Sequence, residues 1–404
     1  MNEYVLSIII PVYNRAELVN SCVTDILEQS VEVEIVLVDD FSTDNTAKVC
    51  ADFSSKYQNI VFVKMTQNKG PGAARNEGIK VAGGKFLFFL DSDDRIVNIV
   101  SLMKLLNDNP DVDVVCSNMI SVRADGTTYE STHVFNEEQQ MEMDEWFNKN
   151  SATSIHSHLY RTTRREFIQE NNILYPELYC AEDGIFTLDV LMNARSIYVT
   201  PLLVYRYYQQ MPNSLVELSR ADGNKELSFT AMTQMINHLV RLVEKERIAI
   251  RRVFLERVLD NTVMVAISFS SAEALKNNST IVGKHFKSIT SKISSLCTDK
   301  DVYLCPGSVF NLDLAYIFNS IGNVPINGFI DNMSKANACG RRLLDNGFKL
   351  YKPELIAGKN GVVILFSPSP VIIKALITQF SNLGFSAEYH KGVYYLIEKE
   401  MTYE

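Results

Sequence analysis

The chain has 404 residues, 46% hydrophobic and 22% charged, which is typical of a soluble globular protein of about two or three domains. The net charge of −9 argues against a general nucleic-acid-binding surface. The seven cysteines are scattered and odd in number and lack C-x-x-C spacing, which predicts reduced thiols and excludes a disulfide framework.

The first part of the chain alternates between predicted strands and helices. Apolar runs at residues 5–12, 34–38, 60–64 and 86–90 predict buried strands. We expect Asn14 to cap the first intervening helix, with Glu17 in capping-box position, and Ser42 or Thr43 to cap the second. This alternation predicts a parallel sheet covered by helices.

Acidic side chains follow two of these strands. The pair Asp39-Asp40 ends the second strand, and Asp91-Ser92-Asp93-Asp94 ends the fourth. Ligands of open α/β sheets bind at the carboxyl ends of strands, and hard divalent cations bridge carboxylates to phosphates. We therefore predict a metal–diphosphate site at Asp91-Ser92-Asp93. The alternative for each cluster is an ordinary acidic turn or helix cap.

Four segments together carry a resemblance. In chain order they are Pro11-Val12-Tyr13-Asn14, Val38-Asp39-Asp40-Phe41-Ser42-Thr43-Asp44, Asn68-Lys69-Gly70-Pro71-Gly72-Ala73-Ala74-Arg75-Asn76 and Asp91-Ser92-Asp93-Asp94. Their order and spacing resemble those of the family 2 glycosyltransferases, which have a GT-A fold and transfer sugars from nucleotide diphosphates. The resemblance covers roughly the first half of the chain.

The resemblance implies roles for single residues. Tyr13 would lie beside the nucleobase, Asp40 would accept a hydrogen bond from it, which favours uracil, and Asp93 would bind Mn²⁺ or Mg²⁺. The implied donor-nucleotide-binding residues are Pro11, Tyr13, Asn14, Asp40, Asn68, Arg75, Asp91 and Ser92. For Arg75, a surface arginine on a helix is the alternative.

A second acidic pair, Glu182-Asp183, precedes an apolar helix over residues 185–192. Acids at a helix start also interact favourably with the helix dipole, so the pair has a purely structural explanation. In the family an E-D pair before an aromatic residue supplies the general base. The resemblance thus implies Asp183 as the catalytic base, supported by Glu182. One base without a nucleophile implies direct displacement with inversion.

Two further segments have less specific features. Tyr205-Arg206-Tyr207-Tyr208, with Ser214, resembles the family's Y-R…S segment, in which Arg206 would help to hold the diphosphate. His156 and His158 are the only closely spaced histidines, and we interpret them as core or cleft-wall residues in preference to metal ligands.

The second half predicts a different organisation. Residues 226–270 have helical periodicity, and a small α/β domain follows from residue 301. Gly307 and Asp331 lie where a dinucleotide-binding fingerprint would place a glycine and the ribose-binding acid, but the other glycines are absent. We therefore expect a degenerate Rossmann-like module that acts as a scaffold, in dimerisation or in positioning the acceptor.

The sequence thus predicts three parts: a GT-A glycosyltransferase catalytic domain at 1–215, a helical linker at 216–299 and a small Rossmann-like α/β domain at 300–404. The leading hypothesis is a metal-dependent, inverting transferase that uses a UDP-sugar and a glycan or lipid-linked glycan acceptor, as in bacterial surface polysaccharide synthesis. The alternatives are a non-catalytic nucleotide-sugar-binding or assembly protein and an NAD-linked sugar-nucleotide oxidoreductase. A homo-oligomer is left open.

The amino terminus lacks the charge and apolar stretch of a signal peptide, and no apolar run approaches the ~18 residues that span a bilayer. These features predict a cytoplasmic protein without a transmembrane segment. The basic helix over 245–257 leaves peripheral contact with the inner face of a membrane open, although interspersed glutamates favour a solvated face.

Overall fold

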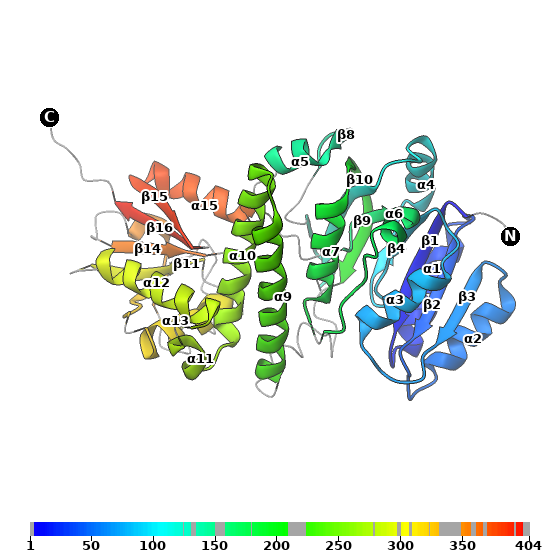
Figure 1. The fold of residues 1–404 in the computed structure, drawn as a ribbon, viewed down its shortest axis with the longest axis horizontal. Coiled ribbons are helices and arrows are strands. Elements are labelled where there is room, and N and C mark those ends of the chain that lie inside the picture. Colours follow the sequence, from blue (N-terminus) through cyan, green and yellow to red (C-terminus); the bar gives the residue numbers. More distant parts are fainter. Residues whose placement is uncertain are drawn as a thin grey trace. The chain divides into compact units, whose positions relative to one another are not determined.

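The computed structural model describes residues 4–123, 125–130, 135–149, 158–178, 180–208, 224–277, 279–296, 300–306, 309–322, 324–330, 349–356, 361–366, 370–391 and 393–398. They form two compact units, the first ending at Asn224 and the second beginning at Lys225 (Figure 1). Each unit contains one β-sheet. His156, Ser214, Gly307 and Asp331 lie outside the described residues.

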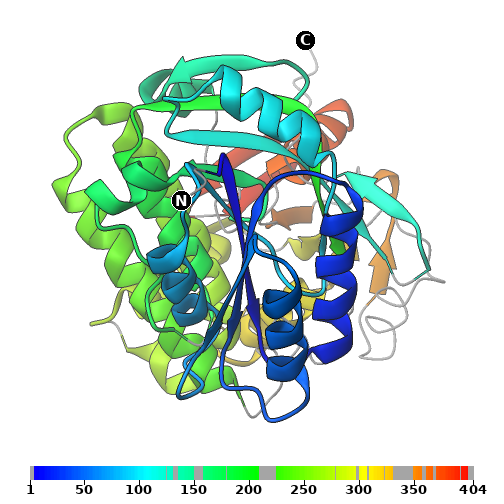
Figure 2. The ribbon, with the colours of Figure 1, turned by 90° about the vertical axis from the view of Figure 1, so that its right-hand side faces the viewer.

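The first unit begins with the predicted alternation. Its strands β1 (Leu6–Val12), β2 (Glu34–Asp39), β3 (Ile60–Lys64) and β4 (Phe86–Phe89) are parallel and lie in the order β3-β2-β1-β4. Helices α1 (Ala16–Glu28), α2 (Thr46–Lys56) and α3 (Pro71–Val81) connect them. Because right-handed crossovers run outward through α1 and α2 and back through α3, α3 lies on the opposite face from the other two (Figure 2).

The sheet continues in mixed orientation beyond β4. Strand β9 (Arg161–Arg164) lies antiparallel between β4 and β6 (Val114–Val122), and β6 pairs in parallel with β10 (Ser196–Tyr208). The predicted parallel arrangement is thus confirmed for β1 to β4, and the strands beyond β4 run in both directions. The remaining elements are β5 (Arg95–Ile96), α4 (Ile99–Asp108), β7 (Thr128–Glu130), β8 (Gln139–Glu142), α5 (Met143–Lys149), α6 (Arg165–Glu170) and α7 (Glu182–Asn193).

Both predicted helix caps are wrong. Helix α1 begins at Ala16, and the side chain of Asn14 bonds to the β2–α2 loop instead of capping α1. Helix α2 begins at Thr46, beyond Ser42 and Thr43, and the Asp44 carboxylate accepts a hydrogen bond of 2.9 Å from the Thr46 N–H. The polar residues after β1 and β2 therefore join the two loops to each other.

The core of the first unit follows from strand alternation. Leu6, Ile8 and Ile10 on one face of β1 are fully buried in the cluster that includes Val19 and Cys22 of α1. On the other face, a Cβ atom at Gly78 of α3 would lie 2.4 Å from Cγ2 of Ile9, so only glycine lets α3 approach β1 this closely. The sheet is therefore covered tightly on both faces.

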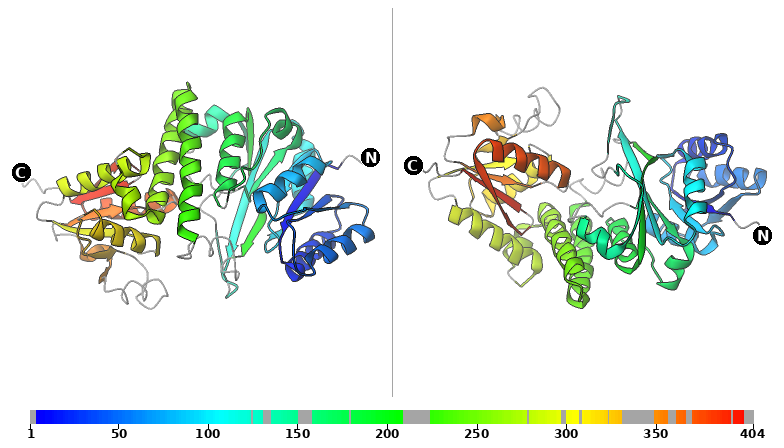
Figure 3. Two further views of the ribbon diagram at one scale, coloured as in Figure 1. Left: turned by 60° about the horizontal axis from the view of Figure 1, so that its bottom comes forward. Right: turned by 90° about the horizontal axis from the view of Figure 1, so that it is seen from above.

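The second unit combines six described helices with a second sheet (Figure 3). Its described strands lie in the order β13-β12-β11-β14-β16-β15, with the first four parallel. The strands are β11 (Asp301–Cys305), β12 (Gly328–Ile330), β13 (Lys349–Tyr351), β14 (Gly361–Leu365), β15 (Phe385–His390) and β16 (Val393–Glu398). The described helices are α9 (Lys225–Lys245), α10 (Ala249–Phe269), α11 (Ala272–Lys276), α12 (Ile281–Leu296), α13 (Val309–Ser320) and α15 (Pro370–Asn382).

The predicted small α/β domain is thus confirmed. Between β13 and β14 the chain forms a single 3₁₀ turn, Pro353–Leu355. Along β11, Val302 and Leu304 pack into a cluster with the helices α9, α10, α12 and α13, whereas Tyr303 and Cys305 pack with α15 on the other face. The helices that precede this sheet therefore share its core.

Within the described ranges, the longer helices are all too polar or too short to cross a membrane.

Candidate active site

The predicted site residues gather at one edge of the first sheet. Strands β1, β2 and β4 are parallel neighbours, so their carboxyl ends lie at the same edge. The chain moves outward from β1 to β3 and then returns to β4 beside β1. This reversal creates the crevice in which open α/β sheets bind their ligands.

Two aromatic rings are exposed at this edge. Tyr13 follows β1 and is 43% exposed, and Phe41 follows β2 and is 46% exposed. The Asn14 carboxamide oxygen accepts a hydrogen bond of 2.8 Å from the Thr43 N–H, which ties the two loops together. Asn14 and Phe41 have left-handed backbones, with φ of 51° and 64°. Such conformations are costly in non-glycine residues and occur mostly where a site needs them.

Asp40 shapes the loop before α3. Its carboxylate accepts hydrogen bonds from the N–H groups of Lys69 (2.8 Å) and Gly70 (2.7 Å). Burial raises the pKa of Asp40 and the nearby Asp39 charge adds to this, while the two backbone bonds act against it. Each carboxylate oxygen keeps a second lone pair for a ligand. The preceding Asn68 is exposed, and Pro11 is buried within β1.

The acidic loop after β4 is fixed from behind by β10. The buried Asp94 carboxylate accepts hydrogen bonds from the Tyr205 hydroxyl (2.7 Å) and the Tyr208 N–H (2.8 Å). The same Tyr205 hydroxyl accepts a bond of 3.3 Å from the Asp91 N–H. Burial, followed by the charge of Asp91, raises the pKa of Asp94 to about 8. Asp94 therefore positions the loop, and Ser92 is buried within it.

Asp93 is the acid of this loop that fits a metal. Its carboxylate is half-buried, and burial, followed by the charge of Asp91, raises its pKa. A bound cation would relieve this cost. Within the described ranges, no three acids, histidines or cysteines are arranged as a metal cluster. Mg²⁺ needs only one or two protein carboxylates when phosphates of the substrate complete its coordination, so the residues present fit such an ion.

Arg75 connects this loop to the start of α7. Its guanidinium lies 2.7 Å from the Asp91 carboxylate and 3.2 Å from that of Glu182, and its side chain is only 5% exposed. The central guanidinium carbon of Arg75, Cζ, also lies 5.3 Å from the centre of the Tyr175 ring. The interpretation as a surface arginine is therefore wrong. Arg75 is a buried counter-ion shared by an acid of the β4 loop and an acid of α7.

Asp183 lies at the start of α7, beside this ion pair. Burial, followed by the charge of Glu182, raises the pKa of Asp183 to about 8, while Arg75 acts against the shift. The preceding Ala181 has a left-handed backbone with φ of 65°. A Cβ atom at Gly72 of α3 would lie 3.0 Å from Cγ of Glu182. Helices α3 and α7 therefore approach each other closely at the predicted base.

Arg206 lies apart from these residues. Neighbouring residues of a strand point to opposite faces, and Tyr205 points inward to Asp94, so Arg206 points away and is exposed. The structure thus joins Asp91, Arg75 and Glu182 by direct contacts, with Asp183 next to them. Direct contacts between these residues and Arg206 or Asn68 are absent from the described part of the chain.

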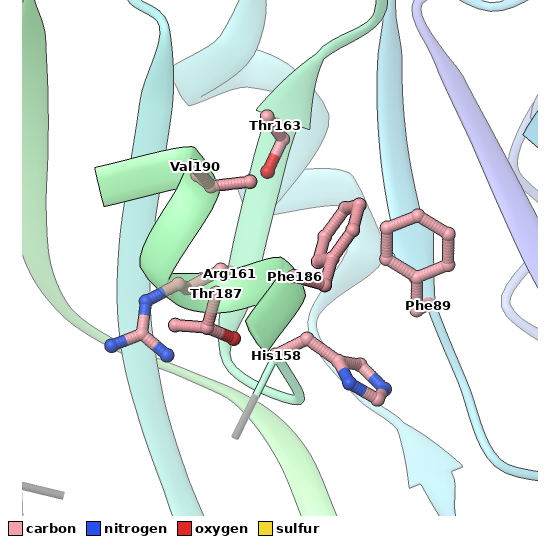
Figure 4. Close-up of a pocket in the computed structure, with 7 residues that line it drawn as sticks. All are labelled: Phe89, His158, Arg161, Thr163, Phe186, Thr187 and Val190. Carbon is pink, nitrogen blue, oxygen red and sulfur yellow. The ribbon is translucent and has the colours of Figure 1, made fainter. Parts of the chain in front are cut away.

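An aromatic cluster lies beneath the start of α7. Tyr175 stacks on Phe186 with ring centres 3.9 Å apart, and Phe89 meets both edge-on. His158 is 3% exposed, and its ring meets the rings of Phe89 and Tyr175 edge-on. Figure 4 shows His158 with Phe89 and Phe186. Burial, followed by the charges of Arg75 and Arg161, lowers the pKa of His158, which therefore stays neutral. It forms part of the core, as interpreted from the sequence.

The sequence assigned no role to Tyr205 or Tyr175, although Tyr205 begins the segment that resembles the family's Y-R…S segment. Tyr205 is separated from Asp94 by 111 positions, and no motif links them. Tyr175 lies outside all the motifs, although its backbone forms two hydrogen bonds with the Asn76 carboxamide, of 2.8 and 2.9 Å. Asn76 closes the third motif, and that was the one available signal.

The parallel strand order and the acidic residues at one sheet edge agree with the GT-A fold expected from the sequence. The family model described as "Glycosyl transferase family 2" matches residues 7–171. Residues 7–171 lie within the first unit, so the match confirms the predicted resemblance of this part of the chain to the family 2 glycosyltransferases.

Two curated relatives match this chain over different lengths. A poly(ribitol-phosphate) beta-glucosyltransferase of Bacillus spizizenii is 28% identical over 78% of this chain and 48% of its own length. The poly(ribitol-phosphate) beta-N-acetylglucosaminyltransferase TarS of Staphylococcus aureus is 31% identical over 50% of this chain and 35% of its own. The chain therefore spans half or less of either enzyme.

Among solved structures, S. aureus TarS 1-349 in complex with UDP-GlcNAc aligns with 67% of this chain and 82% of its own, at 22% identity and a TM-score of 0.49.

Proposed function

We propose that this protein is a metal-dependent, inverting hexosyltransferase that moves a sugar from a UDP-sugar to a hydroxyl of a glycan acceptor. One observation carries the proposal. The buried Arg75 binds both Asp91 and Glu182. Asp91 belongs to the acidic loop 91–94 after β4, here called the donor loop, and Glu182 belongs to α7, which carries the proposed base. The residues implied for donor binding and for catalysis therefore belong to one connected site.

The donor nucleotide is proposed to lie along the edge formed by the β1 and β2 loops. The exposed Tyr13 ring offers a stacking surface, and Asp40 would accept a hydrogen bond from the imide N–H of uracil through its remaining lone pairs. Pro11, Asn14 and Asn68 complete this part of the site, and Ser92 supports the donor loop. Arg206 remains a proposed diphosphate-binding residue, because its strand β10 pairs with β5 directly after the acidic loop: Arg206 is the partner of Arg95.

Asp93 would hold the Mn²⁺ or Mg²⁺ ion, which supplies charge neutralisation of the diphosphate leaving group when bound. The protein's own contribution here is to keep Asp93 half-buried and, among the described residues, without a competing side-chain partner, while Asp94 and Tyr205 anchor the loop. Asp91 is held by Arg75 and so cannot swing away from the site.

Asp183 is proposed as the general base. The acceptor oxygen bonds to the anomeric carbon as the bond between that carbon and the diphosphate oxygen breaks, and the hydroxyl proton moves to Asp183. A carboxylate whose pKa is raised to about 8 is basic enough for this transfer near neutral pH. An α-linked donor then gives a β-linked product, which agrees with the beta-transferase names of both poly(ribitol-phosphate) relatives.

We also propose the cellular setting and the domain limits. The proposed acceptor is a glycan or lipid-linked glycan of a bacterial surface polysaccharide, and both relatives are named for a polymer, poly(ribitol-phosphate). We propose the cytoplasm, at the inner face of the membrane, as the place of the reaction. The catalytic domain is proposed to end at residue 215, and residues 216–299 and 300–404 support it.

Calorimetric titration of the full chain with UDP, GDP and NAD⁺, with and without Mn²⁺, tests the proposal. We expect UDP to bind more tightly when Mn²⁺ is present, and Asp93→Ala to remove this gain. Asp52→Ala, which removes an exposed acid from α2, is the matched control. GDP binding in place of UDP would overturn the uracil assignment, and binding of neither nucleotide would overturn the transferase.

A further inference from the structure

The second unit contains a groove that the proposed transfer reaction does not use. Helix α9, helix α11 and the start of α12 border it (the helices are labelled in Figure 1), and its volume is about 520 Å³. Small-molecule sites in proteins typically measure ~300–1,000 Å³. All of its lining residues belong to the second unit.

The floor of this groove is apolar. Ile236 of α9 and Val282 of α12 are buried members of the core cluster of the second unit. Phe229 is half-buried, packs against the same cluster and lines the groove. An aromatic ring held in this way offers a flat apolar surface to a ligand.

The rim of the groove is polar and exposed. Among the described residues, no side chain pairs with the Asn237 carboxamide or with the Glu273 carboxylate, and both are exposed. The Asn277 carboxamide oxygen accepts bonds from the N–H (3.0 Å) and the hydroxyl (2.6 Å) of Ser279, which fixes its orientation. Its NH₂ group has no partner in the described part of the chain.

The charge of the lining excludes several ligand classes. Glu273 is the one charged side chain among the described lining residues, which contain no lysine or arginine. Cationic side chains commonly bind nucleotides and phosphodiester polymers, the described lining has none, and the Glu273 carboxylate repels such anions. A wholly apolar ligand would cover the rim amides without pairing them, which costs free energy.

We propose that this groove is a second glycan-binding site, which takes a neutral oligosaccharide. Amide and carboxylate side chains pair with sugar hydroxyls as both donors and acceptors, and an aromatic ring packs on the C–H face of a pyranose. Phe229 provides the ring, and Asn237, Glu273 and Asn277 provide the polar groups. That this glycan is a stretch of the acceptor rests on the proposed function.

Saturation-transfer NMR on the full chain, without donor or metal, tests the groove directly. The probes are maltotriose, cellotriose, mannotriose and N,N′,N″-triacetylchitotriose. We expect at least one to bind, and Asn237→Ala to weaken its binding at least tenfold. Gln234→Ala is the control, because Gln234 is an exposed amide on the same helix that does not line the groove. It should leave binding unchanged.

Three outcomes would overturn the inference: no binding of any probe, equal binding to the Asn237→Ala variant, or binding that Asp93→Ala removes while Asn237→Ala retains it. The last outcome would place the sugar at the transfer site and support the proposed function. Conversely, probe binding that depends on Asn237 in a protein that binds no UDP would retain the groove and overturn the transferase. Circular dichroism of each variant confirms that the helices are intact.

Discussion

The two sheets of this protein share one topology and differ in the chemistry of their strand ends. In each, the first strand lies at the centre, the second and third follow on one side, and the fourth lies on the other side. In each, an antiparallel strand then pairs with the fourth, β9 in the first sheet and β16 in the second. Both sheets therefore have the reversal of strand order at which open α/β sheets bind nucleotides.

Only the first sheet has acids after both its second and its fourth strand. These two strands are followed by Asp40 and by the 91–94 loop, and Arg75 supplies the counter-charge. In the second sheet, Asp331 follows the second strand, β12, whereas the fourth strand, β14, is followed by Phe366 and Ser367-Pro368-Ser369. Fold topology thus provides the location of a site, and the charged residues at the strand ends determine whether it has a function.

The largest effect is expected at the base. Asp183→Asn should lower turnover by about 10²–10⁴-fold, because the amide cannot accept the acceptor proton. Binding of UDP should change less than about twofold, since the nucleotide residues are intact. Initial rates of sugar transfer, measured together with calorimetry, check both parts. Unchanged turnover would remove Asp183 from the mechanism and favour a non-catalytic binding protein.

The next largest effect is on stability. Arg75→Met should destabilise the first unit by about 3–5 kcal/mol, because it leaves the buried Glu182 without its counter-ion. Trp146 is the only tryptophan of the chain and is buried in the first unit, so its fluorescence during urea unfolding reports on that unit.

The matched control for Arg75 lies in the second unit. Lys292→Met breaks the partly exposed pair with Glu388 and should cost at most about 1 kcal/mol. The unfolding transition seen by Trp146 should not move. A loss of less than about 1 kcal/mol in Arg75→Met would show that the ion pair is not a structural element of the first unit.

A smaller loss is expected when the anchor of the donor loop is removed. Tyr205→Phe leaves the buried Asp94 carboxylate one partner short and should cost about 1–3 kcal/mol. Tyr198→Phe on the same strand is the control, because the Tyr198 hydroxyl donates to the exposed Glu138 at 3.2 Å and should contribute little. Equal losses in the two variants, by urea unfolding, would contradict the anchoring role.

A smaller change is expected when the rate of sugar transfer is measured at different pH values. The base acts only when deprotonated, and burial together with the Glu182 charge raises the pKa of Asp183 to about 8. The value of kcat/KM should therefore rise with pH and reach half of its maximum near pH 8. Glu182→Gln removes the neighbouring negative charge and should shift the profile to lower pH. A shift to higher pH would contradict this electrostatic coupling.

The smallest effect is expected in the second sheet. Asp331→Asn changes the acid that occupies the ribose-binding position of a dinucleotide fingerprint, although Asp331 lies outside the described residues. Transfer rates should stay within experimental error, and neither the variant nor the original chain should bind NAD⁺ by calorimetry. Binding of NAD⁺ that the variant loses would give the second sheet a function of its own.

The sequence predicted the strands of the first sheet well, because buried parallel strands are short apolar runs bounded by polar turns. Strand β9 escaped prediction because Arg161–Arg164 contains no apolar residue, although all four of its residues are buried. Its burial depends on partners distant in sequence, such as the Asp113 carboxylate 2.6 Å from the Arg164 guanidinium. No local pattern encodes such a pair.

The site was predicted as separate motifs, and the contacts between them were not. Spacing along the chain identified Asp91 and Glu182, but nothing in it shows that one arginine bridges them. The roles assigned to Asn14 and Asp40 rested on resemblance, and the structure adds that both side chains bond to loop backbones. Predicted helix caps failed for the same reason, because tertiary partners outcompeted local ones.

Substitution of Gly72 is expected to change the distance between α3 and the start of α7, where the proposed base lies. A side chain at this position has to displace Glu182 or the backbone oxygen of Pro176, which would lie only 3.2 Å from its Cβ atom. Alanine, serine and valine at this position have side chains of increasing volume. They should separate α3 from α7 by increasing distances without replacing any reactive group. Turnover across such a series measures how steeply the reaction depends on alignment alone, separately from acidity or charge.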